Sequence, residues 1–538
     1  MAMRKIIITS IFLCLCCVFS GCSASKSNEA QNNAQMNSDA TVGSLVQIVS
    51  PESVPVEGVG LVAGLDGKGS AECPTDIRKY LSQYILSELP SDSDFDADAF
   101  INSLNTAVVV IDGDLPVQDS SRPYFDLRVA ALRGTQTVSL ENGWLYRSEL
   151  KVKGSFGINT EILADAEGPV FIDKTDTTMP DKKIGYILGG GKIAIKYVIG
   201  LVLNKPDFAM TNAIRNRLNM RYGENTARAV KSGVIEVALP DKYKEQRAKF
   251  VKLLKATYVY DVPQNDQERI HKHIMQLTEN PQSDEGEIAL EALGNQSLRQ
   301  LYTILNSPDE HIRLRAARCM LTLRSDAGMD VLREIAMNRQ SPYRIEALEA
   351  ITRSGRSQDA SALSLALLKD EDFNIRLAAY EQLRKLNDIS IIGKPIAKSF
   401  YIENVTQTDK KDIYVSRSGE PKVVLFGAPL YCKRGSLIEL DGQDVMIDAL
   451  TDPNYVTVTR KYSNRPNLTG QIKCSYRLDS IIQALCEQPP ERGQESRMGL
   501  GVSYCDLIAL LEQMCDKGAV EAQFHAGPLP NFDLNIKK

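Results

Sequence analysis

The chain has 538 residues and a mass of 59.5 kDa, a length that corresponds to three or four domains. Hydrophobic residues make up 43% and charged residues 24%, so the chain can bury cores, and general disorder and collagen-like repeats are excluded. Its 63 basic and 68 acidic side chains give a net charge of −5, which argues against nucleic-acid binding because phosphate recognition needs a basic face. With only four histidines, few groups serve histidine-based catalysis. Composition therefore favours a large protein that neither binds nucleic acid nor acts as an enzyme.

The N-terminus has the layout of an export signal. Arg4 and Lys5 precede an apolar run from Ile6 to Phe19, which is shorter than the roughly 20 residues that span a membrane. Ser20-Gly21-Cys22 resembles a bacterial lipobox. We therefore predict a signal peptide over residues 1–21 and lipidation of Cys22. Because Ser23 follows the cysteine, we expect the lipid to be anchored in the outer membrane. Phe19 stands where a leucine is usual, which leaves cleavage without a lipid as an alternative, and an uncleaved anchor is another.

The segment after Cys22 is small and polar, and residues 22–44 are predicted to form a flexible tether. Outside the signal and Cys22, seven cysteines remain: Cys73, Cys319, Cys432, Cys474, Cys486, Cys505 and Cys515. The last five of these lie beyond residue 430. In an oxidising compartment we expect one or two disulfides among the last five, and the odd count leaves at least one thiol over. None of these seven cysteines forms a C-x-x-C pair, so the sequence does not support a zinc ribbon or a thioredoxin-type site.

A repeated pattern occupies the middle of the chain. Three segments of the form apolar-Arg-x-x-Ala-x-x-x-apolar start at Ile312, Tyr343 and Ile375, which are 31 and 32 residues apart. Shorter apolar helices are predicted before them, around Leu298–Leu305, Met329–Ala336 and Ala360–Leu368. This resembles HEAT-type repeats and predicts a helical solenoid over residues 266–395, with an ordinary helical bundle as the alternative. The arginines Arg313, Arg344 and Arg376 are then candidate protein-binding residues.

The flanking regions are predicted to mix helices and strands, which gives an α+β fold class. Alternation predicts strands at Thr106–Ile111, Tyr124–Leu132, Ile193–Leu203 and Val234–Leu239. Helices are predicted from Asp207 to Gly223, over Tyr243–Leu254, and from Ser503 to Gly518. The predicted domains are a β-rich unit at 45–165, an α/β unit at 166–265, the solenoid, and an α+β unit at 396–538.

Glycine-rich segments suggest nucleotide sites but lack the required spacing. Gly69 separates Lys68 from Ser70, whereas a Walker loop needs glycine, lysine and hydroxyl in succession. The glycines from Gly64 to Gly69 would also break the helix that a dinucleotide fingerprint needs. We therefore expect a glycine-rich strand and turn, and a flexible loop at 189–191.

No catalytic, cofactor or metal site is predicted. His271 and His273 stand two residues apart, so on a helix they would face different directions, and we expect surface histidines. His311 and His525 do not belong to any recognisable catalytic arrangement.

Several blocks in fixed order resemble the bacterial flagellar P-ring protein family. Residues 58–69 (GVGLVAGLDGKG) are similar to that family's signature near the mature N-terminus, and the glycines concerned are Gly58, Gly60, Gly64, Gly67 and Gly69. Further blocks resemble the family's later strands and helices, at 107–111, 115–116, 126–132, 203–208, 222–223, 226–228, 233–240 and 501–520. The blocks cover about half of the chain.

This resemblance implies P-ring-like domains on either side of an inserted helical solenoid, and a structural role without catalysis or cofactor. It implies a homo-oligomeric ring around the flagellar rod in the periplasm, with rod and L-ring proteins, and peptidoglycan, as partners. A closed ring needs two different surfaces on each subunit. The lipobox, the repeats and residues 428–497 depart from the family pattern, so the other hypothesis is a non-flagellar lipoprotein scaffold of the envelope that binds a protein partner through the repeats.

Overall fold

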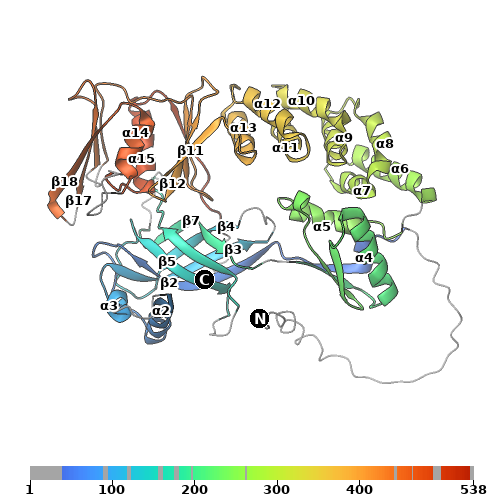
Figure 1. Cartoon of the computed structure of the whole chain (residues 1–538), viewed down its shortest axis with the longest axis horizontal. Helices are drawn as coiled ribbons and strands as arrows, with labels where there is room; N and C mark the ends of the chain where they lie inside the picture. The colour runs from blue at the N-terminus through green and yellow to red at the C-terminus, as the bar shows by residue number, and fades with distance from the viewer. Residues whose placement is uncertain are drawn as a thin grey trace.

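The structure, a computed structural model, describes residues 39–88, 95–117, 123–155, 161–174, 181–195, 198–260, 263–280, 282–440, 445–462, 465–488 and 499–532. The predicted signal peptide and Cys22 lie outside these residues. Figure 1 shows two layers: a barrel and a small α/β unit form one, and a row of paired helices leading into C-terminal sheets forms the other. Among the helices in the described ranges, none combines the length and the apolar character that crossing a bilayer requires.

Six antiparallel strands close into a barrel in the order β2-β3-β4-β7-β6-β5. They are β2 (Ser53–Ala63), β3 (Thr106–Pro116), β4 (Tyr124–Ala131), β5 (Trp144–Val152), β6 (Ala164–Pro169) and β7 (Ile184–Ile193). Inward-facing side chains such as Leu127 and Ile187 fill the interior, because alternate residues of a strand point to opposite faces. The predicted strands at 106–111 and 124–132 are confirmed. Two helices, α2 (Thr75–Glu88) and α3 (Ala97–Ile101), cover the outside of β2 and β3.

A four-stranded sheet with the order β1-β8-β10-β9 forms the second unit of this layer. Its elements are α1 (Val42–Leu45), β1 (Val46–Val49), β8 (Ile199–Leu203), α4 (Phe208–Tyr222), β9 (Ala227–Lys231), β10 (Val234–Val237) and α5 (Arg247–Ala256). The predicted limits of α4 are confirmed: the Asp207 carboxylate accepts hydrogen bonds from the first backbone amides, and Gly223 follows the last turn with φ at 117°. Asp39 pairs with Arg269 and the Val42 amide donates to Thr257, so the end of the predicted tether is already part of the fold.

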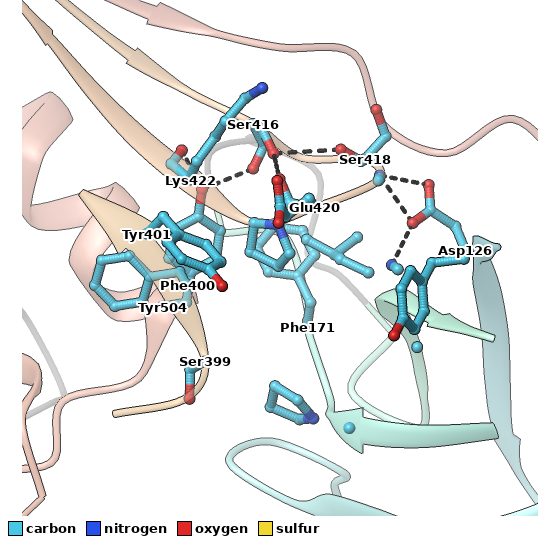
Figure 2. A pocket seen from close by; sticks show the side chains of 18 of the residues that line it. Asp126, Phe171, Ser399, Phe400, Tyr401, Ser416, Ser418, Glu420, Lys422 and Tyr504 are labelled. Carbon is cyan, nitrogen blue, oxygen red and sulfur yellow. Dashed lines mark hydrogen bonds between the residues drawn. The ribbon is translucent and has the colours of Figure 1, made fainter. Parts of the chain in front are cut away.

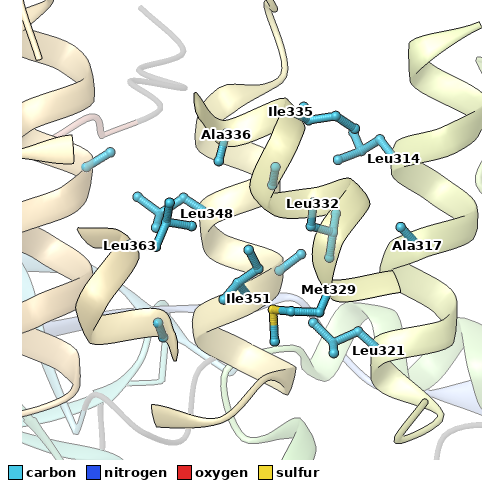
Figure 3. Close-up of a cluster of buried hydrophobic side chains, with 14 of the residues drawn as sticks. Leu314, Ala317, Leu321, Met329, Leu332, Ile335, Ala336, Leu348, Ile351 and Leu363 are labelled. Atoms are coloured by element: carbon cyan, nitrogen blue, oxygen red, sulfur yellow. The ribbon is translucent and has the colours of Figure 1, made fainter. Parts of the chain in front are cut away.

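Eight helices in succession follow the α/β unit within the described ranges. They are α6 (Pro263–Glu279), α7 (Glu285–Leu293), α8 (Leu298–Ile304), α9 (Glu310–Thr322), α10 (Met329–Met337), α11 (Arg344–Ser354), α12 (Ser357–Leu367) and α13 (Phe373–Lys385). Figure 3 shows Leu332 of α10 between α9 and α11, whose apolar side chains share one core. The alanine of each repeat, Ala316, Ala347 and Ala379, is completely buried, because a small side chain lets neighbouring helices approach closely. The predicted helix pairs are therefore confirmed.

The C-terminal region contains two sheets and two helices around one core. One sheet has the order β11-β12-β14-β13-β19 and the other the order β15-β16-β17-β18. The elements are β11 (Ile391–Ile396), β12 (Phe400–Val405), β13 (Asp412–Val415), β14 (Lys422–Phe426), β15 (Leu437–Leu440), β16 (Val445–Asp448), β17 (Val456–Tyr462), β18 (Arg465–Cys474), α14 (Leu478–Cys486), α15 (Tyr504–Asp516) and β19 (Gln523–Ala526). The predicted start of the last helix is confirmed, since Ser503 caps α15 by accepting from the Asp506 amide.

Two predicted domain limits differ from the structure. The boundary at 165/166 falls inside the barrel, because β6 and β7 pair with β5 and β4 and complete the closure. The boundary at 395/396 falls inside β11, which pairs with β12 of the C-terminal sheet. Both errors have one cause: sequence periodicity identifies a strand but not the strands with which it pairs.

Four local predictions are also corrected. Gly189–Gly191 is no loop but part of β7, at an irregularity of its pairing with β4. The strand predicted over 193–203 is divided between β7 in the barrel and β8 in the other sheet. His273 is buried, where its ring bonds to Tyr258 and Gln276, while His271 is exposed. The seven cysteines in the described part of the chain are free thiols, and no disulfide joins those beyond residue 430.

Candidate functional site

Two of the signature glycines, Gly58 and Gly60, lie where the barrel closes between β2 and β5. A Cβ added at Gly58 would lie 2.5 Å from the Glu149 carbonyl oxygen of β5, and one at Gly60 would overlap Ser148 of the same strand. The pairing of β2 with β5 shifts register between Glu57 and Val62, which brackets both glycines. Absence of a side chain therefore lets the two strands cross at close range.

The remaining signature glycines form the turn after β2. Gly64 and Gly67 both have φ at 82°, the region that favours glycine. The amide of Gly67 donates to Asn105 Oδ1 at 2.8 Å, and that of Gly69 donates to the Leu104 carbonyl at 2.8 Å. The turn is thus fastened to the segment before β3. Gly58, Gly60 and Gly69 thus permit close backbone approach, whereas Gly64 and Gly67 permit the positive φ of the turn.

The repeat arginines face the interior of the helical row. Arg344 is 6% exposed and binds Asp370, and Arg376 is 4% exposed and binds Asp412. Arg313 is partly buried and donates to the Ser307 carbonyl in the loop before its own helix. Two of the three predicted protein-binding arginines are therefore occupied inside the molecule, and the structure does not present the three as a surface row.

The C-terminal sheet closes one end of the helical row in the manner of a further repeat. Within the row, Asp370 in the loop after α12 binds Arg344 of α11, one helix earlier. Asp412 on β13 binds Arg376 of α13 in the same way and also bonds to His525 of β19 at 3.0 Å. The sheet thus supplies the carboxylate that another repeat would have supplied.

The α/β unit closes the other end of the row. Arg221, near the end of α4, donates to the carbonyls of Ala292 and Glu291, which end α7. The Glu291 side chain is fully buried, and it binds Lys249 of α5 at 2.6 Å and Tyr243 at 3.2 Å. Both ends of the helical row are therefore covered, which a repeat stack needs because its terminal helices would otherwise expose core.

A cleft of about 1920 Å³ lies where the barrel, α13 and the C-terminal region meet. Figure 2 shows Asp126 of β4 reaching the loop at Ser418 from the barrel side. Its carboxylate accepts hydrogen bonds from the amides of Gly189, at 2.7 Å, and Gly419, at 2.8 Å. Burial raises the pKa of Asp126 more than these two amides lower it. Asp126 therefore joins two regions that are 293 residues apart in sequence.

Two further charged contacts hold the same junction. Arg417 binds Asp173 at 3.0 Å. Lys174 binds Asp506 at 2.6 Å and Glu141 at 2.9 Å, and Asp506 is 1% exposed. Because these groups from the barrel side and from the C-terminal region pair with one another, they fasten the C-terminal region to the barrel. In the described ranges, no group of three or more histidine, cysteine, aspartate or glutamate side chains is arranged to hold a metal ion.

The Glu141 carboxylate makes this junction sensitive to acid. Burial opposes its ionisation, but Lys174 and Lys182 outweigh burial and lower the pKa of Glu141. A lowered pKa in the folded state contributes stability above the unfolded value, about 4.3, and this contribution is lost as pH falls through the folded value. We expect Glu141→Gln to lower the thermal midpoint most at pH 7, with the difference from wild type shrinking towards pH 3.5. Glu224→Gln, on an exposed turn, is the control, and an equal deficit at both pH values for Glu141→Gln would contradict the assignment.

Comparison with known proteins concerns the barrel and the α/β unit. Residues 41–270 match the family model described as flagellar P-ring protein. The flagellar P-ring protein of Fervidobacterium nodosum is 27% identical over 213 residues, which are 37% of this chain and 60% of the relative. The flagellar P-ring protein of Desulfotalea psychrophila is 24% identical over 262 residues, which are 45% of this chain and 62% of the relative. Flagellar P-ring protein 1 of Hahella chejuensis is 30% identical over 203 residues (34% and 50%).

The chain spans about three fifths of the length of the first of these relatives. The matched stretch ends in α6, so the later helices and the C-terminal sheets lie beyond it. The resemblance of residues 501–520 to the family's C-terminal helix stays a prediction. Residues 41–270, which fold as the barrel and the α/β unit, are the part of the chain that is similar to the flagellar P-ring protein family.

Proposed function

We propose that the protein is a structural subunit of the P ring of the flagellar basal body, assembling in the periplasm around the rod. The observation that carries the proposal is the family match over residues 41–270, which coincides with two complete folded units. The additional helices follow this stretch and leave it uninterrupted. Lys174 pairs with Asp506, and Arg417 pairs with Asp173. These pairs fasten the C-terminal region to the barrel, which supports a structural role.

The regions beyond residue 270 are proposed to enlarge the ring. We assign the paired helices to HEAT-like repeats and the C-terminal sheets to a cap on them. The scaffold alternative, in which a partner is captured by the arginine row, loses its main support because Arg344 and Arg376 are buried.

Lipidation of Cys22 would tether each subunit to the outer membrane. The 17 residue-to-residue steps from Cys22 to Asp39 span at most about 60 Å when the chain is fully extended. Labelling of cells with a palmitate analogue should mark the wild-type protein and not Cys22→Ser. An unlabelled wild-type protein would contradict the anchor and would leave the ring proposal unaffected.

Deletion of the gene tests the function. Electron cryotomography of the deletion strain should show rods without a P ring and cells without swimming, and a wild-type copy should restore both. Intact P rings in the deletion strain would contradict the proposal.

A further inference from the structure

The layer that contains the barrel and the α/β unit has an acidic and apolar face at its barrel end (Figure 1). This face is formed by α2, α3 and the residues beside them. Leu86 and Leu104 are 50% and 60% exposed, and Phe95 is also exposed. The Phe95 ring packs on Phe100, which in turn packs on Tyr146, so these three rings form a continuous cluster. Three exposed acidic residues, Glu88, Asp96 and Asp98, lie on or beside these helices, and Glu88 pairs with Arg147 at 3.2 Å. We call this surface the α2–α3 face.

The α4 helix presents a basic and apolar face at the other end of this layer (Figure 1). Phe208 and Met220 are 71% and 68% exposed, which is unusual for side chains of this size. The helix has no acidic residue, and of its three arginines Arg217 and Arg221 donate to backbone carbonyls of the same subunit, which leaves Arg215 to contribute to this face. Residues 205–231 contain six basic residues and two acidic ones. We call this surface the α4 face.

We propose that the α2–α3 face of one subunit docks on the α4 face of a second copy of this chain, so that copies join head to tail. The two faces carry opposite charge around exposed apolar centres, the arrangement that gives an interface its specificity and its burial. They lie at opposite ends of one layer, so one copy cannot satisfy both within itself. Both belong to the stretch that matches the P-ring family. This inference rests on the proposed ring, because a closed ring needs two different surfaces on each subunit.

Charge reversal tests the pairing of the two faces. One variant carries Glu88→Lys with Asp98→Lys on the α2–α3 face, and the other carries Lys205→Glu with Arg215→Glu on the α4 face. Alone, each variant brings like charges together at every junction, and we expect the concentration for half-maximal assembly to rise at least about 10-fold. In a one-to-one mixture each junction is complementary again, so assembly should recover. Sedimentation of the purified mature chains measures this concentration.

Removal of the apolar anchor tests the same contact independently. We expect Phe208→Ser to raise the half-maximal concentration by about 30-fold, as truncation of a central interface residue does. The side chain is mostly solvent-exposed in the single chain, so the thermal midpoint should not change.

Matched controls lie on the outer face of the helical row. Asp330→Lys with Glu334→Lys reverses as many charges on α10, and Tyr302→Ser removes a side chain that is 60% exposed on α8. Both should assemble as wild type does. Wild-type assembly by all face variants, or failure of the mixture to recover, would overturn the inference and leave the ring proposal standing. A wild-type chain that stays monomeric under every condition would instead contradict the proposed function.

Discussion

Replacement of Gly69 by alanine is expected to destabilise the barrel by about 3 kcal/mol, the upper range for overpacking a tight site. The added Cβ would overlap the Thr106 carbonyl oxygen and lie 2.7 Å from that of Leu104. Both are backbone atoms, and Gly69 itself donates to the Leu104 carbonyl, so relief would require breaking the junction between the turn and β3. Trp144, the single tryptophan, pairs with Ala63 at the end of β2. Its fluorescence during urea unfolding therefore reports on this part of the barrel.

The matched control is Gly393→Ala on β11. A Cβ there would meet only Glu403 side-chain atoms at 3.7 Å and beyond, so we expect no loss of stability. The Trp144 transition should shift to lower urea in the Gly69 variant alone. Equal midpoints for the two variants would show that the turn does not need its glycine.

Replacement of Asp412 by alanine is expected to cost about 3–5 kcal/mol, because it leaves the buried guanidinium of Arg376 without a counter-charge. Asp412 and Arg376 have side chains only 2% and 5% exposed. Asp412 also orients His525, whose ring stacks on Phe373 of α13 at 3.6 Å. Hydrogen exchange of the full chain should therefore show lost protection in α13, β13 and β19.

Two companion variants separate the charge effect from general damage. Arg376→Met combined with Asp412→Leu removes both charges and should recover much of the lost protection, since an apolar pair can replace a buried ion pair. Arg333→Met breaks exposed pairs with Asp330 and Asp359 and should change little. If Asp412→Ala left exchange in α13 unchanged, the C-terminal sheet would not act as the cap.

The sequence predicts local elements well where a period or a cap marks them. The repeat pattern locates α9, α11 and α13, and Asp207 with Gly223 marks the limits of α4. These features depend on neighbours within a few residues, which a linear pattern contains. The glycine signature is likewise visible in the sequence, although its physical reason, the close crossing of β2 and β5, is not.

Contacts between distant segments are not predictable from this one sequence. Lys174 and Asp506 are 332 residues apart, and Arg376 finds its acid on a strand that the repeat pattern does not include. The repeat spacing also makes Arg344 and Arg376 look like a surface row, because a period alone does not show which side of a helix is covered. The end of the barrel is likewise not predictable, since its closure by β6 and β7 depends on which strands pair with them.

Single-particle imaging of the purified mature protein tests the central claim most directly, namely that the chain works by binding copies of itself. We expect closed rings whose subunits have the two-layered outline of Figure 1, with adjacent copies in contact through the layer that contains the barrel and the α/β unit. Particles that remain single at every concentration, with and without purified rods, would contradict it.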